Sequence, residues 1–343
     1  MMGRDFRELV SHVGSGPKSA DDMDYEAAKL AFGEILSGDV SPVALGGFWV
    51  ANRWKRNTPE ELAGFVDAMR EDSVSVAAPD CSPVDCGANY DGKARTALLG
   101  VASGLVAAAA GTPVVVHSGD RVPMSEGCAY RHVLDELGVD TDLDPETSAD
   151  MTDEVGFGFY DQARFNPGVA ALEADRRALG VRTFVNTVET LANPADASVH
   201  LGSFFHTTFG ERIVNTFAES RTQDVERVLM FQGLEGYDDV RPGRTTVVEW
   251  DGAEIETDRH GMDFDGDALD VADVPADSAR ITEEVLSGER DGDLADAVAF
   301  NAALRLYARD DVQSIDDGVE RARDALADGS AADRLVALRQ FDG

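Results

Sequence analysis

The 343-residue sequence is poor in cysteine, in lysine and in long apolar runs. Its three cysteines, Cys81, Cys86 and Cys128, lack the spacing of a metal site, so we expect free thiols in a reducing cytoplasm. No stretch reaches the roughly 18 consecutive apolar residues of a membrane span, which argues against a membrane partner. The first residues, "MMGRDFRELVSHVG", predict a polar helix rather than a signal peptide.

Charge of one sign dominates the composition. There are 65 acidic against 30 basic residues, a net charge of -35, and the acids run along the whole chain rather than forming a local acidic tail. In a compact fold so many acidic side chains repel one another and destabilise the folded state. Molar salt screens this repulsion, because it shortens the Debye length to about 3 Å. The composition therefore predicts the salt-rich cytoplasm of a halophile. It argues against nucleic acid as a partner, because phosphate binding requires basic patches.

Residues 1–75 have the pattern of a bundle of short helices. In "SPVALGGFWVANRW", Ser41 is the expected N-cap and Pro42 the first helical residue. In "TPEELAGFVDAMRE", Thr58 is the expected cap, and Glu61 can complete a capping box. The basic cluster "NRWKR" at 52–56 is best interpreted as a helix end, where cations suit the dipole.

From residue 74 onward, strands and helices alternate. "VSVAAPD" (74–80) and "TPVVVHSGD" (112–120) predict buried strands, and "TALLGVASGLVAAAAG" and "CAYRHVLDELG" predict helices. Further along we expect a helix over 167–179, a buried strand in "VERVLMFQGLEGYDD", a hairpin around Asp251–Gly252 and acidic helices over 276–343. Alternation of this kind predicts a parallel, wound sheet, which binds ligands at the carboxyl ends of its strands.

Four segments carry a family resemblance: "ILSGDVSPVALGGFWVANRWKRNTPEELAGFVDAMRE", "VLDELGV", "RRALGVRTFVNTVETLANPA" and "GLEGYDDV". Over roughly residues 25–270 the chain resembles the anthranilate phosphoribosyltransferase family. The resemblance implies an α/β fold with a smaller all-helical domain, of the type shared with nucleoside phosphorylases. The helical domain would span 1–75, joined by roughly 160–182, and the α/β domain 76–159 and 183–343.

The resemblance also implies an activity and its partners. Family enzymes transfer phosphoribosyl from phosphoribosyl pyrophosphate to an aromatic amine, anthranilate, in tryptophan biosynthesis. They use Mg²⁺ and form homodimers through their helical domains. Such a transfer requires little covalent chemistry from the protein, so no catalytic residue is assigned. The acidic composition would place this member in a halophilic archaeon.

The family's pyrophosphate loop corresponds here to "DCGANYDGKARTALLG" (85–100). Counting back from the shared "AAAG" at 108–111, the family's Asn, Ser and Thr fall on Leu98, Gly100 and Val101, which cannot bind a phosphate or a metal. The loop resembles a divergent branch, some bacterial members of which bind nucleic acid. Its backbone and charges still favour an anion site, with a surface turn as the alternative. The candidate residues are Gly87, Asn89, Gly92, Lys93, Arg95 and Thr96.

Further substrate contacts follow from the resemblance. "VHSGDR" replaces the family's Lys-His-Gly-Asn, which makes His117, Gly119 and Arg121 candidates, with a structural histidine as the alternative. Arg176 matches the arginine that faces the anthranilate carboxylate, to which a guanidinium donates two parallel hydrogen bonds. An arginine exposed to solvent is the alternative.

The metal site is expected in "GLEGYDDV". Asp238 and Asp239 match the paired acids that hold Mg²⁺, and Glu235 is a further candidate. A solvated acidic face is the alternative. Three functions stay open at this point: a phosphoribosyltransferase, a nucleic-acid-binding paralogue without catalysis, and a protein that binds a phosphate ligand without turnover.

Overall fold

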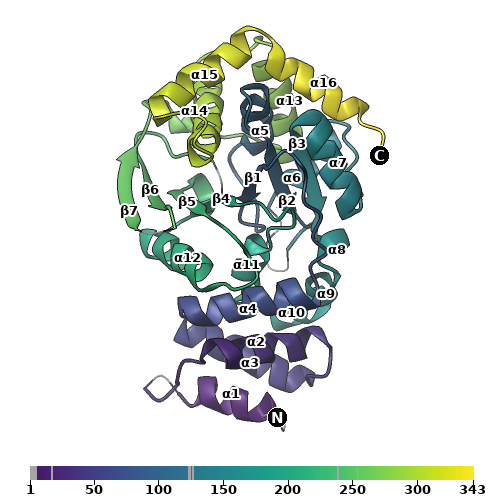
Figure 1. The fold of residues 1–343 in the computed structure, drawn as a ribbon, viewed down its shortest axis with the longest axis vertical. Helices are drawn as coiled ribbons and strands as arrows, with labels where there is room; N and C mark the ends of the chain where they lie inside the picture. Colours follow the sequence, from purple (N-terminus) through teal and green to yellow (C-terminus); the bar gives the residue numbers. More distant parts are fainter. Residues whose placement is uncertain (1–5, 17, 123–124, 126, 238, 253) are drawn as a thin grey trace.

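The computed structural model describes residues 6–343 except 17, 123–124, 126, 238 and 253. A helical part formed by the start of the chain lies below a larger α/β part (Figure 1). The helical part consists of α1 (Phe6–Gly14), α2 (Tyr25–Leu36), α3 (Pro42–Lys55) and α4 (Pro59–Asp72). The expected caps are confirmed, since Ser41 accepts from the amide of Ala44 and Thr58 forms a capping box with Glu61.

Three short helices of the middle of the chain pack with the helical part: α8 (Gln162–Phe165), α9 (Pro167–Ala171) and α10 (Glu173–Leu179). Their apolar residues Phe165, Val169 and Leu172 share a core with those of α2, α3 and α4. The helix expected over 167–179 is interrupted at Leu172, which caps the end of α9 and the start of α10.

The sheet has seven strands in the order β3-β2-β1-β4-β5-β6-β7. Their bounds are β1 (Val84–Gly87), β2 (Val114–Ser118), β3 (Phe157–Asp161), β4 (Val199–Phe204), β5 (Arg227–Gln232), β6 (Thr245–Trp250) and β7 (Ile255–His260). The first five are parallel, and β6 and β7 form the expected antiparallel hairpin. The predicted wound, mainly parallel sheet is confirmed.

One predicted strand is wrong. Residues 74–80 are an irregular link between α4 and the sheet, and the strand lies at 84–87 instead. The link satisfies its amides elsewhere, because Ser75 donates to the carbonyl of Phe165 and Ala77 to that of Pro194. This short apolar segment therefore connects the helical part to the α/β part and does not pair as a strand of the sheet.

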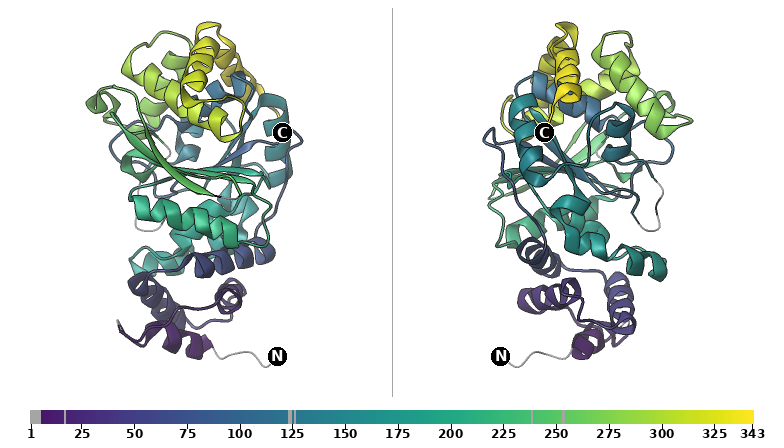
Figure 2. Two further views of the ribbon diagram at one scale, coloured as in Figure 1. Left: turned by 60° about the vertical axis from the view of Figure 1, so that its left-hand side comes forward. Right: turned by 90° about the vertical axis from the view of Figure 1, so that its right-hand side faces the viewer.

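Helices cover both faces of the sheet (Figures 1 and 2). One face packs against α5 (Gly100–Ala109), α6 (Tyr130–Glu136), α13 (Val274–Leu286), α14 (Asp293–Ala308), α15 (Ile315–Ala327) and α16 (Ser330–Gln340). The other packs against α11 (Val185–Val188), α12 (Thr207–Glu219) and the helical part. Near the β3 edge, α7 (Pro145–Val155) completes the fold. Within the described residues, no helix has the length and apolar character to cross a membrane.

Strand alternation assigns side chains to the two cores. Val114 and Val116 of β2 point into one core and Val115 into the other. Because five parallel strands end at the same edge, the loops after β1, β4 and β5 converge there. That edge is the place at which a ligand site is expected.

Candidate functional site

A cleft of about 330 Å³ opens at the carboxyl ends of β1, β4 and β5. Its walls come from the loop after β1, from α11 and the 3-10 turn that follows it, and from the segments after β4 and β5. The polar lining includes Asn89, Arg182, Asn186, His206 and Glu235, and the apolar lining includes Phe205 and Phe209. Of the predicted substrate residues, Gly87 and Asn89 lie in this wall.

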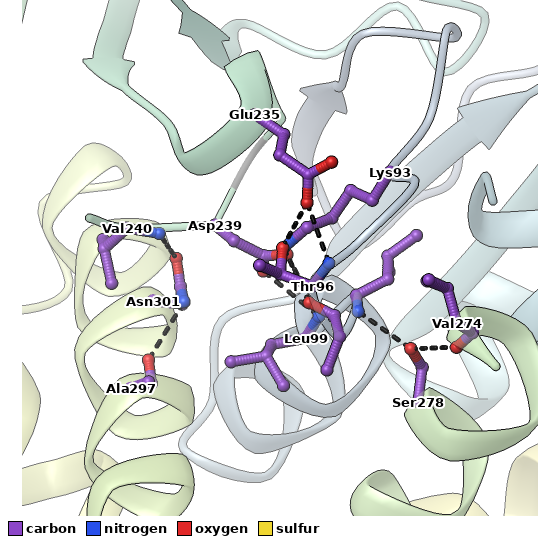
Figure 3. A network of polar contacts seen from close by, with 12 residues as sticks. Lys93, Thr96, Leu99, Glu235, Asp239, Val240, Val274, Ser278, Ala297 and Asn301 are labelled. Atoms are coloured by element: carbon purple, nitrogen blue, oxygen red, sulfur yellow. Dashed lines mark hydrogen bonds and ion pairs between the residues drawn. The ribbon is translucent and has the colours of Figure 1, made fainter. Parts of the chain in front are cut away.

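Two predicted residues bind each other (Figure 3). The Lys93 ammonium is fully buried and donates to the carbonyl of Ala97 and to Asp239, both at 2.6 Å. The Asp239 carboxylate also accepts from the amide of Leu99 at 3.2 Å from each oxygen. The predicted phosphate-binding lysine and the predicted metal-binding aspartate thus form a buried ion pair. Asp238, the other predicted metal ligand, lies outside the described residues.

The loop after β1 does hold an anion, and that anion is a side chain of the protein. Glu235 accepts from the amide of Ala94 at 3.0 Å, from the amide of Thr96 at 2.9 Å and from the Thr96 hydroxyl at 2.5 Å. Burial by itself would raise the pKa of Glu235, but these hydrogen bonds outweigh it and lower the pKa. Thr96, predicted to contact phosphate, therefore contacts a carboxylate instead.

The donor set can be tested against Mg²⁺, the metal that the resemblance implies. Mg²⁺ is usually bound by one or two carboxylates, with waters and substrate phosphates completing the shell. Both carboxylates already accept hydrogen bonds, but Glu235 lines the cleft, whereas Asp239 is fully buried against Lys93. No group of three or more potential ligand side chains occurs among the residues that the structure describes. The residues present fit a Mg²⁺ held through Glu235 and the phosphates of a ligand.

The other loop residues have separate positions. Arg95 is exposed and pairs with Asp270 at 2.5 Å, outside the lining of the cleft. Gly92 has φ +74°, and a Cβ there would lie 2.6 Å from the carbonyl oxygen of Cys128. The glycine thus permits a turn that packs directly on the backbone of the neighbouring segment.

His117 lies beneath the loop, in a buried network on three adjacent strands. Its Nε2 is 3.2 Å from Asp85, its Nδ1 hydrogen-bonds the Tyr90 hydroxyl, and Asp85 also bonds Nδ1 of His200 at 2.7 Å. All four side chains are buried. Burial opposes ionisation of Asp85, but the two histidines outweigh it and hold its pKa well below the ordinary value. Asp85 and His200 were not predicted, although polar residues in buried strands were a visible signal.

The remaining predicted contacts line a second, smaller cavity. Gly119, Arg121 and Arg176 surround a space of about 90 Å³ beside α8, α9 and α10. Arg176 is buried and donates two parallel hydrogen bonds of 2.8 Å to Glu189. Glu189 also accepts from Gln162 at 2.9 Å. The predicted acceptor-binding arginine therefore faces a carboxylate, and here that carboxylate belongs to the chain.

Sequence reasoning missed part of the cleft. Arg182 pairs with Asp91, whose second oxygen accepts from Asn186 at 3.3 Å. Phe205, with an exposed fraction of 62 %, and His206 lie at the carboxyl end of β4. Because β4 was not predicted, the segment "GSFFHTTFG" was not recognised as a strand end with polar and aromatic side chains.

Comparison with known proteins gives a consistent result. The model of the glycosyl transferase family helical bundle domain matches residues 7–73, and that of the family's a/b domain matches residues 91–332. The chain is 35% identical over 325 residues to an anthranilate phosphoribosyltransferase of Methanopyrus kandleri, covering 92% of this chain and 94% of the relative.

Solved structures resemble it over the same length. The anthranilate phosphoribosyltransferase of Thermus thermophilus superposes with a TM-score of 0.83 at 29% identity, covering 97% of this chain and 98% of the other. The enzyme of Saccharomyces cerevisiae, solved in complex with PRPP and Mg, superposes with a TM-score of 0.80 at 18% identity, covering 98% and 97%. The latter likeness shows the shared fold.

Proposed function

This chain belongs to the anthranilate phosphoribosyltransferase family, and we propose that it transfers phosphoribosyl from phosphoribosyl pyrophosphate to anthranilate or a closely related aromatic amine. The family match over nearly the whole chain carries the proposal. The geometry supports it, because two backbone amides of the loop after β1, those of Ala94 and Thr96, face Glu235 in the turn after β5. We call these two amides and the Thr96 hydroxyl the cradle. Tryptophan biosynthesis, in the cytoplasm of a halophile, is the proposed setting.

In this reaction the bond from the sugar C1 to pyrophosphate breaks and pyrophosphate leaves with the electron pair, the amine nitrogen bonds to C1, and the proton that the amine loses passes to solvent. The chain's own contribution is to bind and orient. The loop 93–99 would receive the diphosphate, and Arg176 would receive the acceptor carboxylate in exchange for Glu189. Mg²⁺, held through Glu235 with the pair 238–239 as further candidates, would neutralise the leaving group. We propose that the sugar becomes cation-like as pyrophosphate leaves, so no covalent intermediate on the protein is required.

The test is a transfer assay in molar KCl with Mg²⁺, which follows the loss of anthranilate fluorescence. We expect turnover by the wild-type protein. Arg176→Lys keeps the charge but loses the bidentate geometry, so the KM for anthranilate should rise about tenfold or more while the KM for the donor stays unchanged. Absence of turnover with anthranilate and with related aromatic amines would contradict the proposal.

A second function is favoured by a specific observation. The side chains of Lys93 and Arg176, two of the predicted substrate contacts, are each engaged by a carboxylate of the chain. This suits a protein that binds a phosphate ligand without turnover. In that case phosphoribosyl pyrophosphate would raise the melting temperature while no acceptor was consumed. A gel shift in molar salt tests nucleic acid binding, for which we expect none.

We also propose that the chain forms a homodimer through its helical part. A groove of about 1110 Å³ runs between α1 and α3. Its rim carries Val43 and Trp54, whose exposed fractions are 89 % and 82 %. Exposed apolar side chains of this size gathered around a groove are typical of an interface. Light scattering should give twice the chain mass, and Trp54→Asp should give the single-chain mass; a wild-type monomer would contradict the dimer.

A further inference from the structure

Glu235 has an unusual backbone. It follows β5 in a turn where its φ is +57° and its ψ +13°, in the left-handed region that glycine adopts readily and glutamate does not. The next residue is Gly236, which also has a positive φ and would tolerate this conformation without strain. The chain therefore holds a glutamate in a disfavoured conformation, and the contacts of its carboxylate must compensate.

Those contacts form a complete anion site. Two amides, of Ala94 and Thr96, and the Thr96 hydroxyl converge on the two oxygens of Glu235. Figure 3 shows the contacts of Glu235 with Thr96. Adjacent backbone N–H groups and a hydroxyl are the donors that loops commonly present to a phosphate. Lys93 adds a positive charge that lowers the pKa of Glu235.

The cradle does not depend on Glu235 for its shape. The loop amides that follow Thr96 are anchored from other elements: Ala97 donates to the carbonyl of Leu269, Leu98 to the hydroxyl of Ser278 and Leu99 to Asp239. Lys93 is anchored by its own amide and carbonyl, which exchange hydrogen bonds with Cys128. With its flanks held independently, the cradle stays organised when its occupant leaves, so a competing anion meets preformed donors.

We propose that Glu235 is an internal occupant of this anion site, and that a diphosphate ligand binds by taking over its three donors. The diphosphate rests on the proposed function, from which it is taken. Once displaced, the Glu235 carboxylate, which lines the cleft, would be available to hold a Mg²⁺ that accompanies the ligand. Glu235 thus lowers the affinity for metal-free diphosphate and ties tight binding to the metal.

The test is calorimetric titration of the whole protein with inorganic pyrophosphate in molar KCl containing a chelator. Glu235→Ala removes the occupant, and Glu235→Gln removes its charge while keeping an acceptor oxygen. Glu320→Ala is the control, because Glu320 is exposed on α15 and its removal changes the net charge equally. We expect about tenfold tighter binding for Glu235→Ala, a smaller gain for Glu235→Gln and none for Glu320→Ala.

Hydrogen exchange supplies a readout that does not depend on activity. A peptide covering residues 93–97 should exchange faster in Glu235→Ala than in the wild type, and pyrophosphate should slow it again. In the presence of Mg²⁺ the advantage of Glu235→Ala should shrink or reverse, since the variant has lost a metal ligand. A melting curve for each variant establishes that the fold is retained, and the glutamine variant serves if the alanine variant unfolds.

The outcomes separate the two proposals. If wild type transfers phosphoribosyl but neither Glu235 variant binds pyrophosphate more tightly than Glu320→Ala, the occupancy proposal is wrong and the proposed function stands. If Glu235→Ala gains affinity while no acceptor is consumed, the occupancy proposal stands and the enzymatic function fails. If no variant binds pyrophosphate and the wild type consumes no acceptor, the site is a structural link between two loops and both proposals are overturned.

Discussion

The buried Asp85 connects residues of three neighbouring strands. It lies on β1 between His117 of β2 and His200 of β4, and its pKa is held well below the ordinary value despite complete burial. The network ends at Tyr90, whose pKa burial raises, so that its hydroxyl stays neutral in the loop above. Asp85 therefore links three strands to the loop that forms the cleft wall.

At this scale we predict that Asp85→Asn lowers the free energy of unfolding by about 3 kcal/mol at neutral pH, because the histidines lose their charged acceptor. A carboxyl with a lowered folded pKa stabilises above its ordinary pKa of 3.8 and loses that contribution as the pH falls through the folded value. The difference between wild type and variant should shrink below pH 3.8. Denaturant unfolding across pH measures it; a constant difference would contradict the assignment.

Residue identities in the site were predicted in part. The loop, the acidic turn and the arginine were proposed from the family resemblance, and their role in a binding site stays a prediction. Their partners were not, because the pairs Lys93–Asp239, Thr96–Glu235 and Arg176–Glu189 join residues separated by 146, 139 and 13 positions. No local pattern encodes which carboxylate reaches which donor across such separations.

At the scale of elements, α4 connects the two parts of the molecule. Its buried Asp67 accepts from the Tyr25 hydroxyl at 2.6 Å, from the amide of Arg221 at 2.6 Å and from the hydroxyls of Ser220 and Thr222. One turn further, Arg70 donates to the segment after α11. The helix is thus bonded to the α/β part at two places and acts as the seam between domains.

We therefore predict that Asp67→Ala destabilises the protein by about 3 kcal/mol, because four donors lose their acceptor in a buried seam. Asp72→Ala is the matched control on the same helix. Asp72 is exposed, so its removal should change stability by less than about 0.5 kcal/mol. Chemical unfolding of both variants measures the contrast, and equal effects would show that the seam contributes nothing specific.

Elements were predictable where capping or periodicity was strong. The caps at Ser41 and Thr58 and the hairpin at Asp251–Gly252 were correct because turn chemistry acts over a few residues. The strand expected at 74–80 and the unpredicted β4 failed for the opposite reason. Whether a short apolar segment becomes a strand depends on the strand that pairs with it, which lies elsewhere in the sequence. In β4 the residues His200, Gly202 and Ser203 also interrupt the apolar pattern by which a buried strand is recognised.

At the scale of the whole molecule, the net charge of -35 is expected to make the stability of the fold depend on salt. We predict that the melting temperature rises by at least about 5 °C between dilute and molar KCl, roughly 3–4 kcal/mol for a protein of this size. An equal osmolality of sorbitol should produce a smaller rise, since it does not screen charge. A melting temperature independent of KCl would contradict the halophilic interpretation.

The sequence by itself determined the class of fold, the helix caps and, through motifs that resemble a known family, the family. Fold class and caps depend on local periodicity and turn chemistry, which can be identified without knowledge of the contacts, and the dependence on salt stays a prediction from the summed charge. The tertiary structure alone decided that the anion loop is filled by Glu235, that Lys93 and Asp239 neutralise each other, and that Arg176 holds Glu189. The reason is physical: hydrogen bonds and ion pairs are short-ranged, so only folding determines which distant groups satisfy one another.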